Sequence, residues 1–166
     1  MALIIEDGSI VSGANSYATV SGANAYFTAL GDTRWTTGRT DTQREQAILK
    51  GMKYIEGLNW KGTTVSGTQP LQFPRTGLTD RDGRDVDEDT VPNVVIKALY
   101  EASVRAISGE DLLPDLPRGG RVSAEQVGSI SRAYSTTAPA GTVFTSIKVL
   151  LRGMLKGADN VNIVRA

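Results

Sequence analysis

The chain has no cysteine and no histidine among its 166 residues. It therefore has no thiol nucleophile, no disulfide, no imidazole base and none of the side chains that most often bind zinc. The sequence also lacks the SxxK, GxSxG, GxGxxG and GxxxxGKS/T motifs that support serine, dinucleotide or nucleotide sites. We therefore expect no enzymatic activity, no cofactor and no bound metal.

Aromatic residues are sparse, at 6% of the chain, and they are not interleaved with basic residues. Recognition of single-stranded nucleic acid by base stacking therefore has weak support. Eighteen basic side chains balance eighteen acidic ones, so the chain as a whole lacks the basic excess of an avid nucleic-acid binder. The balance is uneven, because residues 1–120 carry twelve basic and sixteen acidic side chains and residues 121–166 carry six and two.

Long apolar runs are also missing. No stretch of 18 apolar residues occurs, and the first residues lack a basic segment followed by a long apolar one. We expect no membrane contact and a protein that stays in the cytoplasm where it is made. The length is that of one ordinary domain, which buries roughly 70% of the surface of its unfolded chain. We expect a single domain over residues 1–166, with a helical core at about 19–110 and a C-terminal extension at about 121–166.

Hydrophobic periodicity predicts three helices in the first two thirds of the chain. Thr19 is a suitable N-cap for the first, and Gly31 is a suitable stop. Thr42 and Glu45 have the spacing of a capping box at the start of the second. The acidic run 85–89 precedes the third and places negative charge at the positive end of its dipole. The predicted spans are about 20–30, 40–56 and 92–108.

Residues 59–90 show no periodicity, because glycine and proline interrupt every short apolar run. An irregular segment of this length is unusual inside a compact domain and is often functional. Trp60, Phe73 and Arg75 are its candidate anchors or partner contacts. We favour a plug over the helical core, because large aromatic side chains commonly anchor long loops.

Residues 79–85 alternate acids and arginines around Gly83, and the pattern superficially resembles a calcium loop. Arginines occupy alternating positions, and the glutamate that completes an EF-hand is missing. A tight turn held by local hydrogen bonds is the better interpretation.

The C-terminal part is predicted to hold a strand within 126–134, a helix at about 142–156 and a β-like tail at 161–164. The helix would place Lys148, Arg152 and Lys156 on one side. We consider that side a candidate face for DNA or an acidic partner, and the alternative is a solvated face whose cations favour the helix C-terminus. In the tail, the candidates to add a strand to a neighbouring subunit are Val161, Ile163 and Val164.

The predicted fold class is mainly α. It is a small helical bundle with a long irregular loop, a C-terminal strand and helix extension, and a β-like tail.

Several short motifs occur in the same order as in a family found in tailed phages and prophages. They are Ser16-Tyr17-Ala18-Thr19, Ala25-Tyr26-Phe27, Arg44-Glu45-Gln46-Ala47-Ile48, Trp60-Lys61-Gly62, Phe73-Pro74-Arg75-Thr76-Gly77, Asp80-Arg81-Asp82-Gly83, Val91-Pro92 and Val127-Gly128. The resemblance covers nearly the whole chain and is fairly specific in the Trp-Lys-Gly and Phe-Pro-Arg-Thr-Gly blocks. The chain resembles adaptor or head-completion proteins of the head-to-tail connector, which often carry the label DnaT-like single-stranded DNA-binding protein.

The resemblance implies a helical virion protein that forms a ring of about a dozen subunits beneath the portal. The implied partners are other copies of the chain, the portal protein, a neck or tail-side connector protein, and the double-stranded DNA that passes through the channel. The implied location is the head-tail junction of the virion, after assembly in the host cytoplasm. The family label implies an alternative function, that of a replication accessory that binds single-stranded DNA.

Overall fold

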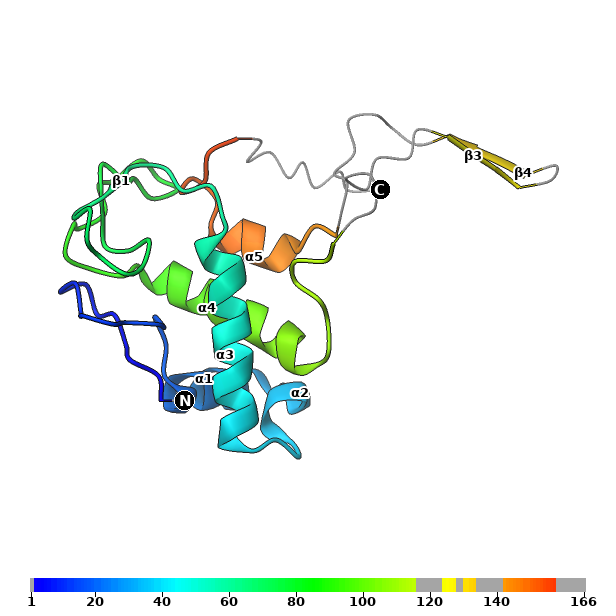
Figure 1. Ribbon diagram of the computed structural model, residues 1–166, viewed down its shortest axis with the longest axis horizontal. Coiled ribbons are helices and arrows are strands. Elements are labelled where there is room, and N and C mark those ends of the chain that lie inside the picture. Colours follow the sequence, from blue (N-terminus) through cyan, green and yellow to red (C-terminus); the bar gives the residue numbers. More distant parts are fainter. Residues whose placement is uncertain (1, 116–123, 128–129, 134–141, 158–166) are drawn as a thin grey trace. The chain divides into compact units, whose positions relative to one another are not determined.

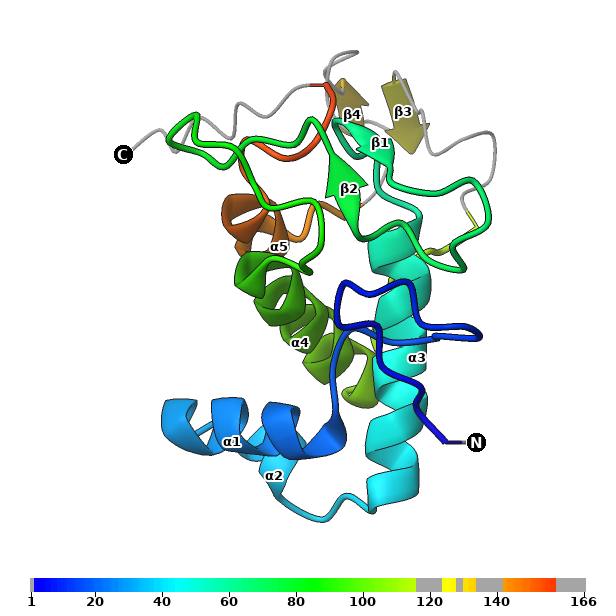
Figure 2. The ribbon, with the colours of Figure 1, turned by 90° about the vertical axis from the view of Figure 1, so that its left-hand side faces the viewer.

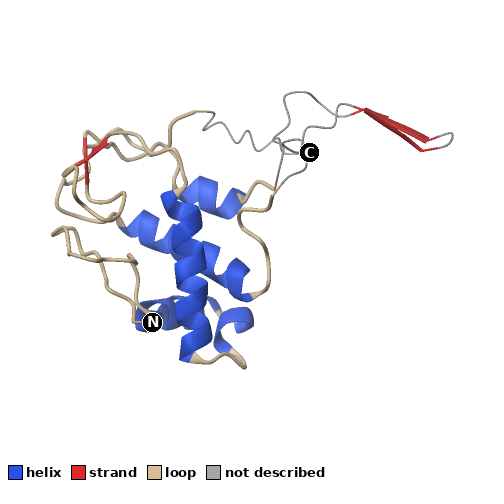
Figure 3. Cartoon of the chain, in the orientation of Figure 1, coloured by secondary structure: helices blue, strands red, loops and turns tan. Residues whose placement is uncertain are grey.

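The computed structural model describes residues 2–115, 124–127, 130–133 and 142–157. Within these ranges the chain is mainly α, with five helices and two small pairs of strands (Figures 1 and 3). The predicted fold class is confirmed. The chain divides into two compact units, residues 1–112 with 145–166 and residues 113–144. None of the described helices is long and apolar enough to cross a membrane.

The first helix, α1 (Val20–Leu30), begins and ends where the sequence predicts. Thr19 Oγ1 accepts a hydrogen bond from the backbone N–H of Gly22 at 3.0 Å. Gly31 ends the helix with a φ of 68°, which glycine adopts without a steric penalty. The buried Phe27 points from this helix into the core.

A single helical turn, α2 (Thr33–Thr36), follows α1 and was not predicted. The side chain of Asp32 caps it by accepting a hydrogen bond from the backbone N–H of Arg34 at 2.9 Å. The turn buries Trp35 completely, with its ring centroid 5.1 Å from that of Phe27. Four residues are too few to show a helical period, so only the capping aspartate marks this element in the sequence.

The second predicted helix is α3 (Asp41–Glu56), but its capping box differs from the expected one. Thr40 accepts a hydrogen bond from the backbone of Gln43, and the Gln43 side chain accepts one from the backbone of Thr40. The predicted pair, Thr42 and Glu45, lies two residues further along, inside the helix. The Thr-x-x-Gln/Glu spacing occurs twice here, and the earlier threonine is the one with the extended backbone that a cap requires.

The third predicted helix is α4 (Asn93–Ile107), which packs across α3 in the core of the first unit (Figure 2). Gly51 of α3 lies against it. A Cβ atom on Gly51 would lie 2.8 Å from Ser103 Oγ and 3.1 Å from Leu99 Cδ1. The absence of a side chain at this point therefore sets how closely the two helices approach. The buried face of α4 includes Val95, Ala98, Leu99, Ala102 and Ala106.

The long connection between α3 and α4 is irregular, as expected, apart from one minimal antiparallel pair. Its strands are β1 (Thr63–Thr64) and β2 (Arg75–Thr76). The second unit holds an antiparallel hairpin of β3 (Ala124–Val127) and β4 (Ile130–Ala133). The sequence predicted a single strand here, and the structure has two strands paired with each other.

The last helix is much shorter than predicted. α5 (Thr145–Leu150) has six residues, whereas the apolar periodicity indicated a helix to about residue 156. The helical path ends because Gly153 has a φ of 93° and lies so close to the loop that a Cβ atom would be 2.9 Å from Arg81 Cα. The apolar side chains of Ile147, Leu151 and Met154, which follow one another at helical spacing, are nevertheless buried.

Replacing Gly51 with alanine tests the close crossing of α3 and α4. Alanine favours a helix over glycine by roughly 1 kcal/mol, but its methyl group would displace Ser103. We expect a net loss of about 1–3 kcal/mol in the free energy of unfolding, the usual cost of overpacking. Gly57→Ala is the matched control, because its φ of −76° suits any residue and its nearest neighbour would be 3.4 Å away. Urea unfolding measures both variants, and a Gly51→Ala protein as stable as the wild type would contradict the prediction.

Candidate functional site

A buried polar cluster holds the long loop against the end of α3. We call it the loop cluster; it comprises Tyr17, Glu56, Gln72, Phe73 and Arg75. The Tyr17 hydroxyl donates to Glu56 Oε1 and accepts a hydrogen bond from the backbone N–H of Phe73 at 3.1 Å. The other carboxylate oxygen, Glu56 Oε2, accepts one from the backbone N–H of Gln72 at 2.9 Å. Both ends of the Tyr17–Glu56 pair are thus tied to the middle of the loop.

Arg75 lies inside the loop and binds two of its stretches through hydrogen bonds. Its residue is 6% exposed, and its guanidinium donates only to groups of the loop itself. Nε donates to the carbonyl of Lys61 at 2.9 Å, and Nη2 donates to the carbonyl of Gly62 at 2.9 Å. Nη1 donates to the backbone carbonyl and the side-chain oxygen of Gln72. Arg75 therefore joins the first residues of the loop to the segment that precedes β2.

Trp60 and Phe73 occupy the interior beside this network. Their rings meet edge to face with centroids 4.8 Å apart, and both residues are at most 3% exposed. Trp60 Nε1 donates to the carbonyl of Ile55 at 3.1 Å. The structure therefore places all three candidate residues of the loop, Trp60, Phe73 and Arg75, in its interior.

The same part of the loop holds the segment that follows α5. The backbone N–H of Lys61 donates to the carbonyl of Met154 at 2.8 Å, and that of Lys156 donates to the carbonyl of Asn59 at 2.6 Å. The Lys61 ammonium group also donates to the carbonyl of Gly153 at 2.8 Å. Residues 59–61 and 153–156 thus form a short antiparallel contact that the sequence did not predict.

The three basic residues proposed as a helical stripe are not on one helix. Lys148 lies in α5 and is half-buried, Arg152 lies in the turn after it and is exposed, and Lys156 lies in the segment paired with Asn59 and is exposed. The expectation of a continuous basic helix face was wrong, because the helix ends at Leu150. The predicted tail strand of Val161, Ile163 and Val164 lies outside the described residues.

Residues 79–85 form the predicted tight turn. Asp80 Oδ1 accepts hydrogen bonds from the backbone N–H groups of Arg84 and Asp82, at 2.9 and 2.8 Å. These bonds stabilise the ionised carboxylate and lower the pKa of Asp80 below its ordinary value. The Asp80 carboxylate thus stabilises the turn through these hydrogen bonds. Within the described residues, no group of three or more acidic side chains is arranged to hold a metal ion.

The aromatic side chains of the described residues are used in the core. All are buried except Tyr26, which is half-buried. The Tyr26 ring packs on Tyr100 with centroids 5.1 Å apart, and its hydroxyl donates to Glu101 at 3.3 Å. No fully exposed ring is therefore present in this part of the chain to stack on a base.

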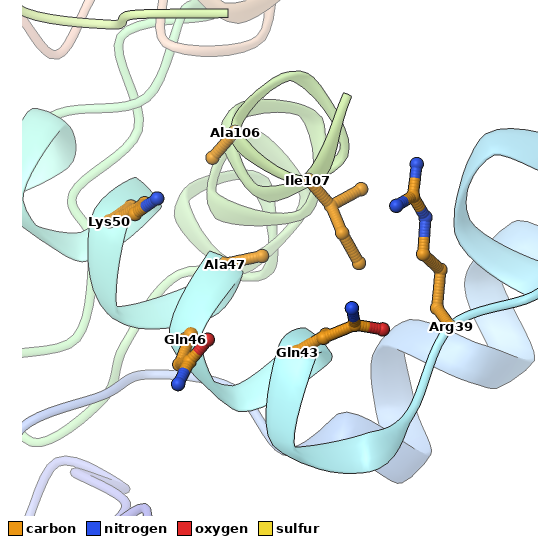
Figure 4. A pocket seen from close by; sticks show the side chains of 7 residues that line it. All are labelled: Arg39, Gln43, Gln46, Ala47, Lys50, Ala106 and Ile107. Carbon is orange, nitrogen blue, oxygen red and sulfur yellow. The ribbon is translucent and has the colours of Figure 1, made fainter. Parts of the chain in front are cut away.

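A shallow groove of about 140 Å³ lies between α3 and the C-terminal end of α4 (Figure 4). Its floor consists of Ala47, Ala106 and Ile107. Sites for cofactors and small molecules usually have a volume of roughly 300–1,000 Å³, so this groove is too small for such a ligand. We call it the α3 groove, and its polar rim consists of Arg39, Gln43, Gln46 and Lys50.

The sequence indicated Trp60, Phe73 and Arg75, but it did not indicate Tyr17 and Glu56, the other side chains of the loop cluster. Tyr17 and Glu56 are 39 residues apart, and no local pattern links them. The α3 groove was missed because its residues come from two helices and the segment before α3. The only local signal was the recurrence of polar side chains at helical spacing along α3.

A family model described as "Putative DnaT-like ssDNA binding protein" matches residues 1–166 of the chain. No curated protein and no solved structure matches the chain. The family match extends over both compact units.

Glu56 makes the loop cluster sensitive to pH. Burial raises the pKa of its carboxyl above the ordinary 4.5, and the hydrogen bonds from Tyr17 and Gln72 and the charge of Arg75 offset only part of this effect. The folded state therefore favours the protonated form. Ionisation of Glu56 costs no stability below pH 4.5, and its cost grows as the pH rises from 4.5 through the raised pKa.

Glu56→Gln removes this ionisation and keeps an oxygen that can accept the hydrogen bond from Gln72. We expect the stability of the variant relative to the wild type to increase between about pH 4 and pH 7, because only the wild type loses stability when Glu56 ionises. Urea unfolding at several pH values measures the difference. Glu45→Gln removes a carboxylate of the same helix outside the cluster and serves as the control. A constant difference between Glu56→Gln and wild type across this range would refute the prediction.

Proposed function

We propose that the chain, which belongs to the family of DnaT-like ssDNA-binding proteins, is a structural adaptor of a phage head-to-tail connector. In this role it forms a ring with other copies of itself and docks on the portal protein. It receives the neck or tail-side component and surrounds the double-stranded DNA. The alternative, a replication accessory, requires a surface that grips single-stranded DNA.

The observation that carries the proposal is the burial of the aromatic side chains. Proteins that bind single-stranded DNA stack bases on exposed aromatic rings, and each such contact contributes about 1–3 kcal/mol. In the described residues the rings pack on one another, as in the contacts of Phe27 with Trp35 and of Phe73 with Trp60. The family label alone therefore does not identify a stacking surface on this chain.

Two further features support a role in contacting neighbouring proteins. The loop cluster gives residues 59–90 a defined shape, and a preorganised surface loses less conformational entropy on binding. The β3–β4 hairpin belongs to a compact unit of its own. A two-stranded hairpin has two open edges, and each can accept a strand from a neighbouring subunit.

The particles of the phage or prophage that encodes the chain provide the direct test. We expect quantitative mass spectrometry of purified particles to find the chain at a low fixed copy number, about a dozen per particle as for a portal-matched ring. The portal protein of the same sample supplies the internal reference for copy number.

Two results together would support the replication accessory instead. The first is absence of the chain from particles although infected cells contain it. The second is binding to a single-stranded oligonucleotide, measured by fluorescence anisotropy, with an affinity that falls steeply between about 50 and 200 mM salt. Negligible binding to the oligonucleotide agrees with the connector role.

The basic residues near the C-terminal end of the described chain offer a second test. We expect replacement of Lys148, Arg152 and Lys156 by glutamine to leave the fold intact, because two of the side chains are exposed and the third is half-buried. The same variant is expected to join heads to tails less efficiently, measured as infectious particles in a complementation assay. Circular dichroism checks the fold. Loss of folded protein would show that the three cations have a structural role, and full complementation would remove them from the docking surface.

A further inference from the structure

Three cations lie along one side of α3 and the segment before it: Arg39, Lys50 and Lys53. Helical periodicity places Lys53 on the same side as Lys50, and it places Asp41 and Glu45 on the other side. Among the residues that the structure describes, none forms an ion pair with these three cations. The α3 groove therefore carries positive charge that none of the described residues neutralises by an ion pair.

Unpaired negative charge lies in front of α4. Within residues 85–89, Asp85, Asp87, Glu88 and Asp89 are exposed. Glu88 bonds to Thr76, but the three aspartates form no ion pair with any described residue. The dipole of α4 acts only over its first turn, and Asp85 and Asp87 lie six or more residues before Asn93. Helix capping therefore does not account for the whole acidic run.

The two patches lie at opposite ends of one helix. α4 has 15 residues, which at 1.5 Å per residue separates its ends by about 22 Å. The acidic run precedes its first residue, whereas Ile107, its last residue, forms part of the groove floor (Figures 1 and 4). The two patches thus do not neutralise each other within one chain. Different, complementary patches on one subunit are the requirement of a heterologous interface, which repeats head to tail and can close into a ring.

We propose that the acidic run, residues 85–89, of one copy docks on the α3 groove of the next copy. This inference rests on the proposed ring-forming function and specifies its subunit contact. A carboxylate of the run accepts hydrogen bonds from the cations and amide groups of the rim. The groove has the volume of about five water molecules, which suits one acidic side chain above a small apolar floor.

A phosphate of DNA is the other anion that the rim cations fit. DNA would account for the groove but would leave the acidic run without a partner. A second copy of the chain accounts for both patches with one contact. We therefore assign the groove to the neighbouring subunit and make DNA an outcome of the test.

The test exchanges the charges of the two patches in the full chain. The groove variant is Lys50→Glu with Lys53→Glu, and the run variant is Asp87→Lys with Asp89→Lys; all four side chains are exposed. Native mass spectrometry and sedimentation over a concentration series at low salt measure assembly. We expect each variant to raise the concentration for half-assembly about tenfold or more, because each brings like charges together.

Restoration distinguishes a direct contact from a general effect of charge. We expect the chain with all four substitutions to assemble within about threefold of the wild type, because the patches are again opposite in sign. An equal mixture of the groove and run variants is expected to assemble together for the same reason. The control, Asp115→Lys, reverses an exposed charge outside both patches and is expected to leave self-assembly unchanged.

Three outcomes overturn the proposed contact. In the first, the groove variant assembles like the wild type. In the second, the four-site chain fails to regain assembly, and loss of DNA binding by the groove variant would then assign the groove to phosphate. In the third, the wild-type chain stays monomeric at every concentration. None of these outcomes decides the connector role, which depends on whether the chain is present in particles.

Discussion

The buried guanidinium of Arg75 is the interaction on which the long loop depends. Burial of a charge is costly unless hydrogen bonds replace its hydration, and here the replacement comes from the carbonyls of Lys61, Gly62 and Gln72. Those carbonyls lie just before the strands β1 and β2, which pair with each other over only two residues. The arginine adds hydrogen bonds between the two stretches that so short a strand pair does not supply. Because Lys61 also pairs with Met154, the same side chain indirectly holds the segment that follows α5.

The helices that could be predicted from the sequence are those with a full apolar period. α1 and α3 also have a polar cap, whereas α4 begins after Pro92 without a side-chain cap, and the bounds of all three match within a residue. Near the C-terminal end of the described chain, the apolar period predicted too long a helix. Ile147 and Met154 are buried at helical spacing, but Gly153 turns the backbone between them. Periodicity reports which side chains are buried, and it does not report whether the backbone that carries them stays helical.

The candidate site could be predicted only in part, for a different reason. Trp60 and Phe73 are large apolar side chains in a polar segment, so their burial follows from hydrophobicity alone. The partners of Arg75, and the pairing of Tyr17 with Glu56, depend on how distant segments meet in space. The charge of the α3 groove is likewise a property of the assembled helices. A net charge of zero over the whole chain conceals it, because opposite charges collect at different ends of α4.

The pairing of residues 59–61 with 153–156 has a consequence for when the fold is completed. Lys61 and Gly153 are 92 positions apart, so most of the polypeptide must be synthesised before the two can meet. Helices α1 to α4 precede this contact in the chain, whereas the antiparallel contact forms only afterwards. A nascent or prematurely terminated chain that stops before residue 153 lacks the contact. The contact between the two segments is therefore completed only after residue 156 has been synthesised.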